Sequence, residues 1–390
     1  MKDLLLSLLN DARLGIGSDP QPGDYQLLHH MAQEHQVSAL IYNQLYHFPG
    51  LPAQLKAEWS REALSINAFQ AMRSARFLEL YRRLREGGVN ALVVKGIVLR
   101  SLYPQPDNRQ SNDEDVYIPM DQFPLAAQIL QDSGVTLRHQ GLFEYALLDP
   151  SCGLSIELHG ALFDPDTPVL ARYQALFSDS FRSPALHNID GVPVYSLSHD
   201  LHFLFLVTHL AKHLLFSGVG IRQVLDIVMY AEAFLDQINW PDVYDKLDRL
   251  GLLTLTANLM AIGRSCFHMD RAVPVPEVPT DFEPLLRDIL SAGVFGASSQ
   301  ARLHSASFTL AAAEGERKLS PVSRLFPPRR ELEKRMEYSY LREKPWLLPA
   351  AWGKRLLSYL SRRESARQEQ ETLALGEQRV ALLRKYGVIL

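Results

Sequence analysis

The stretch Asp113-Glu114-Asp115-Val116-Tyr117-Ile118 decides how we interpret the fold. We interpret it as a β-strand, because it ends in apolar and aromatic residues of high strand preference. Side chains alternate between the two faces of a strand, so Asp113 and Asp115 share one face. The sequence therefore predicts two carboxylates that converge on the same side of a sheet.

Glu114 lies between the two aspartates and must point to the opposite face of the strand. Core side chains could fill that face, and an unpaired carboxylate buried among them is costly. Two arrangements would avoid this cost. Either Glu114 has a basic partner, or its strand lies at the edge of the sheet.

A second strand is predicted over Leu154 to His159, and it carries Glu157. If this strand neighbours the first, its carboxylate lies on the same side as Asp113 and Asp115. Three oxygen donors suit Mg²⁺, with Mn²⁺ as the alternative ion. Two such ions could stabilise the attacking and leaving oxygens of a displacement at phosphorus. The alternative for an isolated Asp-x-Asp is a pair of solvated side chains at a strand end.

Lys95 and Gly96 follow directly after Ala91 to Val94, a short apolar run that predicts a buried strand. A glycine at a strand-to-helix turn lets backbone N–H groups approach a phosphate, and the next helix presents its N-terminus to the anion. Arg109, just before the acidic pair, is a candidate phosphate contact. The alternatives are an ordinary turn at Lys95-Gly96 and a solvated surface charge at Arg109.

Hydrophobic periodicity divides the chain into four predicted regions. These are an N-terminal helical region (1–88), a small α/β core (89–198), a helical domain (199–270), and a linker with a basic C-terminal region (271–390). Within them, further strands are predicted at 135–139, 143–149 and 192–196, and helices at 122–132, from 201, at 220–235 and at 240–267. The expected fold class is α+β, a small mixed sheet with N-terminal and C-terminal helical regions.

Composition places the chain among ordinary folded proteins of more than one domain, with 390 residues and a net charge of -4. The only cysteines, Cys152 and Cys266, are too few for a disulfide framework and predict two buried thiols in a reducing compartment. No apolar stretch is long enough for a membrane span. A cytoplasmic location is therefore expected. Residues 317–366 carry 13 Lys or Arg against 5 Glu, typical of a solvated face or of contact with a phosphate-rich acceptor.

His209 and His213 are four residues apart in a predicted helix, the spacing of two zinc ligands. The metalloprotease signature requires Glu directly after the first histidine, and Leu210 stands there instead. These histidines therefore have either a structural role or a role in orienting substrate, together with Lys212 and with His159. The glycines at 218 and 220 lack the strand and third glycine of a dinucleotide-binding turn, which predicts a loop.

In order and spacing, these motifs resemble the uncharacterised nucleotidyltransferase family of the polymerase-β-like superfamily. The resemblance extends over about residues 65 to 260 and rests on Lys95-Gly96, Leu102-Tyr103-Pro104, Arg109, Asp113-x-Asp115, Glu157-Leu158-His159, His209-Leu210-Ala211-Lys212-His213 and Arg222 to Asp226. It implies transfer of a nucleoside monophosphate from an NTP to an acceptor, which could be a small molecule, a peptide, a protein or RNA. It also implies that Asp113, Asp115 and Glu157 are the metal ligands, with Lys95 and Gly96 on the phosphate side.

Two residues depart from the wider superfamily. Many members have Gly-Ser where this chain has Lys95-Gly96, and an apolar residue where this chain has Glu114. A catalytically inactive nucleotide-binding or partner-binding protein on the same fold is thus the alternative to an enzyme. A phosphohydrolase that uses the same metals is a third hypothesis.

Overall fold

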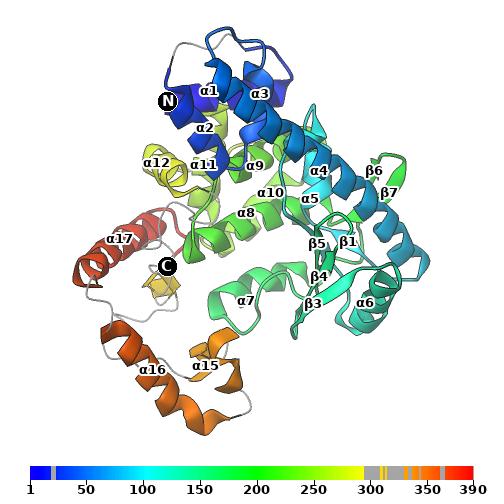
Figure 1. The fold of residues 1–390 in the computed structure, drawn as a ribbon, viewed down its shortest axis with the longest axis vertical. Coiled ribbons are helices and arrows are strands. Elements are labelled where there is room, and N and C mark those ends of the chain that lie inside the picture. The colour runs from blue at the N-terminus through cyan, green and yellow to red at the C-terminus, as the bar shows by residue number, and fades with distance from the viewer. Residues whose placement is uncertain are drawn as a thin grey trace. The chain divides into compact units, whose positions relative to one another are not determined.

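The computed structural model describes residues 1–18, 23–293, 308–310, 312–313, 329–332, 336–341, 344–360 and 365–389 (Figure 1). The chain forms two compact units, Met1–Leu214 with Gly218–Ser298, and Leu215–Ser217 with Ser299–Leu390. Part of the basic segment 317–366, including residues 317–328, lies outside the described residues. The finer division of the chain into four regions stays a prediction.

The N-terminal part of the first unit is helical, as predicted. Its helices are α1 (Lys2–Leu14), α2 (Tyr25–Glu34), α3 (Ser38–Leu45) and the 34-residue α4 (Ala53–Glu86). The C-terminal half of α4 buries Phe77, Leu80, Tyr81 and Leu84, which are spaced i, i+3, i+4 and i+7. One face of this helix therefore packs against the rest of the unit.

A five-stranded mixed sheet follows, in the order β1-β2-β5-β4-β3. Its strands are β1 (Leu92–Val93), β2 (Asp113–Tyr117), β3 (Thr136–Gln140), β4 (Glu144–Asp149) and β5 (Leu154–His159). Only β2 and β5 pair in parallel. The predicted strands and the α+β class are confirmed. A separate hairpin pairs the predicted β7 (Val192–Ser196) with β6 (Ala185–Ile189), a strand that the sequence analysis did not predict.

The hydrophobic core covers one face of this sheet. Apolar side chains of α4 and of α6 (Phe123–Asp132) pack there against Val116, Ile156 and Leu158 from the central strands. In Figure 1, α8 (His199–Phe216) lies on the other side of the strands from α6. The faces of β2 and β5 that carry the candidate site residues are therefore turned away from the core.

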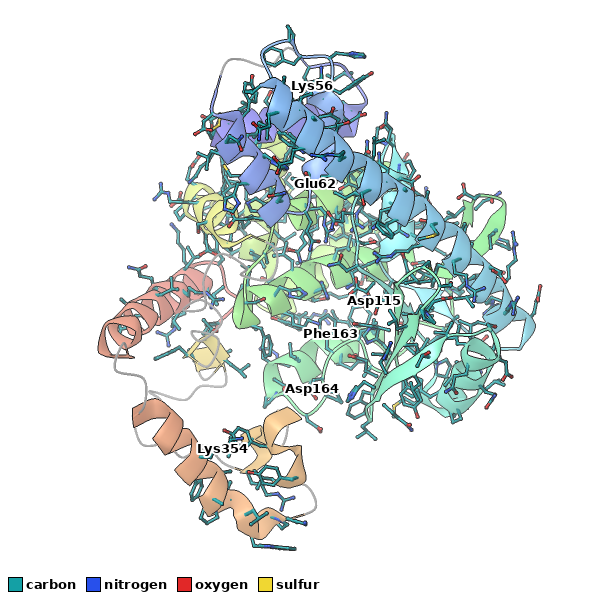
Figure 2. All side chains as sticks on the ribbon, in the orientation of Figure 1. Lys56, Glu62, Asp115, Phe163, Asp164 and Lys354 are labelled. Carbon is teal, nitrogen blue, oxygen red and sulfur yellow. The ribbon has the colours of Figure 1, made fainter. Side chains whose placement is uncertain are left out.

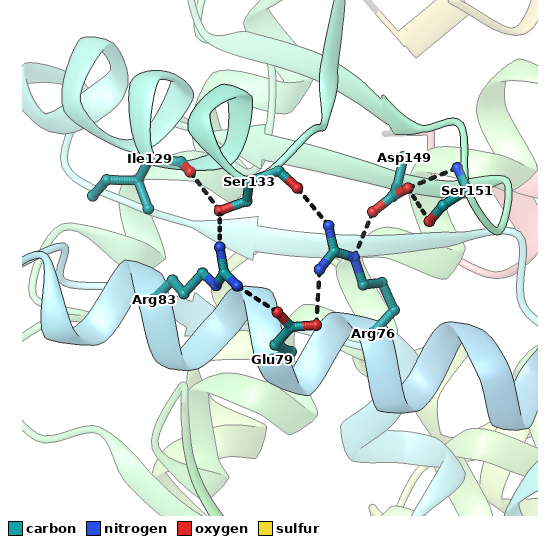
Figure 3. Close-up of polar contacts among 7 residues, drawn as sticks. All are labelled: Arg76, Glu79, Arg83, Ile129, Ser133, Asp149 and Ser151. Carbon is teal, nitrogen blue, oxygen red and sulfur yellow. Dashed lines mark hydrogen bonds and ion pairs between the residues drawn. The ribbon is translucent and has the colours of Figure 1, made fainter.

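Arg76 on α4 ties this helix to the sheet layer (Figure 3). Its guanidinium donates to the carboxylate of Asp149 at 2.6 Å, to the carbonyl oxygen of Ser133 at 2.6 Å and to Glu79 at 2.8 Å. Arg83, one helical turn beyond Glu79, bridges Glu79 and the Ser133 hydroxyl. These contacts fix α4 against the end of α6 and the end of β4.

Helices complete the first unit: α5 (Gly96–Arg100), α7 (Pro168–Gln174), α8, α9 (Ile221–Ala233), α10 (Trp240–Arg249), α11 (Leu253–Cys266) and α12 (Glu283–Ala292). The single helix predicted over 240–267 is wrong, because the chain turns at Gly251, where φ is +80°. Short 3₁₀ segments lie at Pro106–Asn108, Met120–Gln122, Ala175–Phe177 and Leu235–Gln237. Cys152 is buried as predicted, but Cys266 is only partly buried.

The second unit contains α15 (Arg329–Leu332), α16 (Leu348–Leu360) and α17 (Ser365–Lys385), with 3₁₀ segments at Met336–Leu341 and Pro345–Leu347. A small core there joins Leu332, Tyr338, Leu341 and Ala351. Among the described helices of both units, none combines the length and the apolar character needed to cross a membrane.

Candidate functional site

A cavity of about 400 Å³ lies in the first unit, between helices α8 and α9 and the face of the sheet that is turned away from the core. This volume is within the range of small-molecule sites. The cavity is lined by all ten candidate residues from the sequence analysis: Lys95, Gly96, Arg109, Asp113, Asp115, Glu157, His159, His209, Lys212 and His213. Side chains from segments more than 100 residues apart in the sequence thus meet at one place.

The acidic wall of the cavity comes from two adjacent strands. Asp115 on β2 is in register with Glu157 on β5, and this parallel pairing puts the two carboxylates on the same face, as predicted. Ligand atoms of Asp115, Glu157 and His159 all lie within 4.8 Å of one another. Two carboxylates and an imidazole so close together fit a divalent cation. Asp113 lines the same cavity, and its role as a ligand stays a prediction.

Lys95 pairs with the acidic wall. Its ammonium lies 2.8 Å from Oδ2 of Asp115 and 3.3 Å from Nε2 of His209. Burial opposes the positive charge, but Asp115 and Asp113 outweigh it and raise the pKa of Lys95. Burial would also raise the pKa of Asp115, yet Lys95 and His159 hold that pKa well below its usual value. Both groups are therefore charged at neutral pH.

The pKa of Glu157 is shifted in the opposite direction to that of Asp115. Burial and the neighbouring charges of Asp115 and Asp113 raise the pKa of Glu157 to about 7. Carboxylates that crowd one site resist ionising together unless a cation joins them. The carboxylates of the acidic wall therefore favour the binding of a second cation in addition to the ammonium of Lys95.

Behind the cavity, Glu114 has the basic partner that was one of its two predicted alternatives. Its carboxylate pairs with the guanidinium of Arg100, and these side chains are only 2% and 1% exposed. The edge-strand alternative is wrong, since β2 lies between β1 and β5. The carboxylate also accepts the backbone N–H of Ile97 at 2.8 Å. It therefore braces the turn that carries Lys95.

The contact of Glu114 with this turn also explains why residue 96 is a glycine. Its φ is +42°, and a Cβ atom there would collide with the carboxylate of Glu114. The N–H of Ile97 donates to Glu114, so in this arrangement it is not available to a phosphate. The glycine is required by the approach of Glu114 from the core side, a reason that differs from the predicted one.

Arg109 is neither solvated nor free. It is 3% exposed, and its Nε and Nη2 each donate to the carboxylate of Asp226 at 2.7 Å. Tyr103 donates to the same carboxylate at 2.8 Å. The surface-charge alternative is therefore wrong. The bidentate pair joins the segment before β2 to α9.

Arg222 on α9 is a cavity residue that the sequence analysis did not assign to the site. It is 8% exposed, and one Nη donates to the carbonyl oxygen of Gln110, while its Nε has no partner among the described residues. Burial and the nearby Arg109 lower the pKa of Arg222 to about 10. Arg109 already pairs with the nearby carboxylate of Asp226, so the charge of Arg222 favours an anion at this end of the cavity. The i, i+4 spacing of Arg222 and Asp226 in an apolar helix was the available signal.

Helix α8 supplies the remaining wall. His213 and His209 face each other with their Nε2 atoms 3.2 Å apart. The ammonium of Lys212 lies 5.9 Å from the ring centre of Phe163, a residue labelled in Figure 2. Within the described part of the chain, Lys212 forms no ion pair. Burial and Lys95 lower the pKa of Lys212, and burial lowers the pKa of His213 to about 3. Whether these histidines orient a substrate stays a prediction.

Comparison with known proteins adds independent information. A family model described as "Uncharacterised nucleotidyltransferase" matches residues 21–268. A search of curated proteins gives no match. Among solved structures, an antigenic nucleotidyltransferase-like protein from Paracoccidioides brasiliensis is similar to 46% of this chain and 92% of its own, with 17% identity and a TM-score of 0.27.

Proposed function

The chain belongs to the uncharacterised nucleotidyltransferase family, and we propose on this basis that it transfers a nucleoside monophosphate from an NTP to an acceptor. An oxygen of the acceptor would bond to the α-phosphorus. The bond from that phosphorus to the bridging oxygen would break, and pyrophosphate would leave. The confirmed family and α+β fold support nucleotidyl transfer in general, whereas metal dependence, the individual residues and a cytoplasmic location are parts of the proposal.

The observation that carries the proposal is the parallel register of Asp115 and Glu157 on one wall of the cavity. Asp113, Asp115 and Glu157 would hold Mg²⁺ or Mn²⁺. A bound divalent ion would stabilise the negative charge that develops on the phosphoryl oxygens. The pairing of the parallel strands β2 and β5 would set the spacing of Asp115 and Glu157.

The cationic residues that line the cavity would bind the phosphates. Lys95, Lys212 and Arg222 approach from three different elements. Arg109 would contribute indirectly, because its pair with Asp226 holds α9, and with it Arg222, in place. The phosphates would thus contact these cationic groups together with the metal ion that the carboxylates would hold.

One observation favours the inactive binding protein instead. Lys95 is paired with Asp115, and the Ile97 N–H behind it is already bonded to Glu114. If this arrangement persists when a nucleotide is bound, the protein would recognise the nucleotide without turnover.

The test is the release of pyrophosphate by the full chain with Mg²⁺ or Mn²⁺ and each α-labelled NTP in a cell extract. We expect pyrophosphate and a labelled acceptor, both lost in Asp115→Asn. Asp132→Asn, an exposed charge loss on α6, is the matched control and should keep the activity. Nucleotide binding without turnover would support the binding protein, and free phosphate without a labelled acceptor would indicate a phosphohydrolase.

A further inference from the structure

His159 is placed where a metal ligand would be. Its Nε2 lies 2.9 Å from Oδ1 of Asp115 and 3.6 Å from Oε2 of Glu157. Ligands bound to one cation at 2.0 to 2.2 Å lie about 3.0 Å apart at neighbouring octahedral corners and about 3.4 Å apart at tetrahedral corners. The two distances from His159 therefore match those between ligands of a shared cation, and all three donor atoms lie within 4.8 Å of one another.

The sheet determines this placement. Glu157 and His159 are two residues apart on β5 and so share a face, while Ile156 and Leu158 between and beside them are fully buried. Asp115 faces them from the neighbouring strand. Ligands held on paired strands need little rearrangement to bind a cation.

The carboxylate of Glu144 lies beside the other ring nitrogen of His159, although not within hydrogen-bonding distance. Glu144 is the cross-strand partner of His159 on β4, and its Oε2 lies 3.8 Å from Nδ1 of the imidazole. Histidines that bind metals commonly donate their other ring N–H to a carboxylate, which fixes the tautomer. With its proton on Nδ1 toward Glu144, His159 would present the lone pair of Nε2 to the space between Asp115 and Glu157.

We propose that His159 is a direct ligand of the metal in this cavity, and that its imidazole makes the site prefer a divalent transition-metal ion such as Mn²⁺ over Mg²⁺. An imidazole nitrogen binds transition metals well, whereas Mg²⁺ strongly prefers oxygen. The inference rests on the proposed function in that both use Asp115 and Glu157. This inference goes beyond the proposed function because it assigns His159 as the third ligand and predicts which ion the site prefers.

The test uses Mn²⁺ alone with the full chain, without nucleotide. Electron paramagnetic resonance gives the Mn²⁺ affinity, and electron spin echo modulation detects a nitrogen bound to the ion. We expect imidazole nitrogen modulation in the wild type and its loss in His159→Gln, with Mn²⁺ affinity at least tenfold lower. Competition should show that Mg²⁺ affinity changes less than twofold. His139→Gln, an exposed histidine on β3, is the matched control and should behave as the wild type.

Bound Mn²⁺ without nitrogen modulation would overturn the inference and leave His159 as a hydrogen-bond partner of Asp115. So would unchanged Mn²⁺ affinity in His159→Gln, or no Mn²⁺ binding in the wild type. Pyrophosphate release by the wild type separates the two proposals. Activity without nitrogen coordination would sustain the proposed function alone, and nitrogen coordination without activity for any NTP would sustain the metal ligand alone.

Discussion

Replacing Glu114 by glutamine tests the ion pair behind the cavity. The pair with Arg100 is almost completely buried, and Glu114 also accepts the N–H of Ile97. Removing one member of a buried pair leaves the other charge uncompensated, which typically costs about 3 to 5 kcal/mol. Glutamine can still accept one hydrogen bond, so we expect a loss near the lower end, about 3 kcal/mol.

Thermal melting of the full chain, followed by circular dichroism, measures this loss. For a unit of this size, about 3 kcal/mol corresponds to a fall of about 6 °C in Tm. The matched control is Glu79→Gln, which removes a carboxylate that is 45% exposed and paired with Arg76 and Arg83. Exposed pairs contribute less than about 1 kcal/mol, so its Tm should fall by less than about 2 °C.

A double variant separates the charge from the packing. Glu114→Leu with Arg100→Met removes both charges and keeps apolar volume, so it should recover at least half of the lost Tm. If Glu114→Gln melts within about 2 °C of the wild type, or if the double variant is no better than the single one, the pair does not stabilise the turn at Lys95 in the way argued above.

Four further predictions concern the cavity and its surroundings. Asp113→Asn and Asp115→Asn should stay folded yet lose metal-dependent NTP binding; unchanged affinity in calorimetry would show that the metal is held elsewhere. Lys95→Ala should weaken the binding of NTP more than the binding of the free nucleoside. Equal losses of affinity for the two ligands would show that Lys95 does not contact the phosphates. The pKa of Glu157 is raised to about 7, so its ionised form destabilises the folded state above that pH. Without metal, Glu157→Gln should therefore be more stable than the wild type by about 1 to 2 kcal/mol at pH 8. This difference in stability should vanish toward pH 4.5. A lower Tm at pH 8 would contradict this. Burial lowers the pKa of His35 to about 4, so the unfolded chain binds a proton that the folded chain does not between pH 6.5 and 4. Stability should therefore fall by about 3 kcal/mol over this range, and denaturation of His35→Gln should lack that part of the slope.

Features with a local cause could be predicted from the sequence. Strand alternation alone placed Asp113 and Asp115 on one face and Glu114 on the other, because the two-residue period of a strand does not depend on its neighbours. The helical periodicity of residues 1–88 and most of the strands followed from the same kind of local pattern. Such patterns failed where a single residue changed the backbone, as at Gly251, which splits a predicted helix.

Features with a distant cause required the tertiary structure. The sequence predicted that Glu114 needs a partner or an edge, but only the packing of α5 against β2 chose Arg100. The sequence predicted that Arg109 contacts phosphate, whereas in the structure Arg109 pairs with Asp226, more than 100 residues away. The candidate cavity residues could be named from the sequence, because the chemistry of a side chain is set by its residue type. Which of them touch one another depended on how α8 and α9 pack over the sheet, since contacts between distant segments are set by the whole core and by no single stretch of chain.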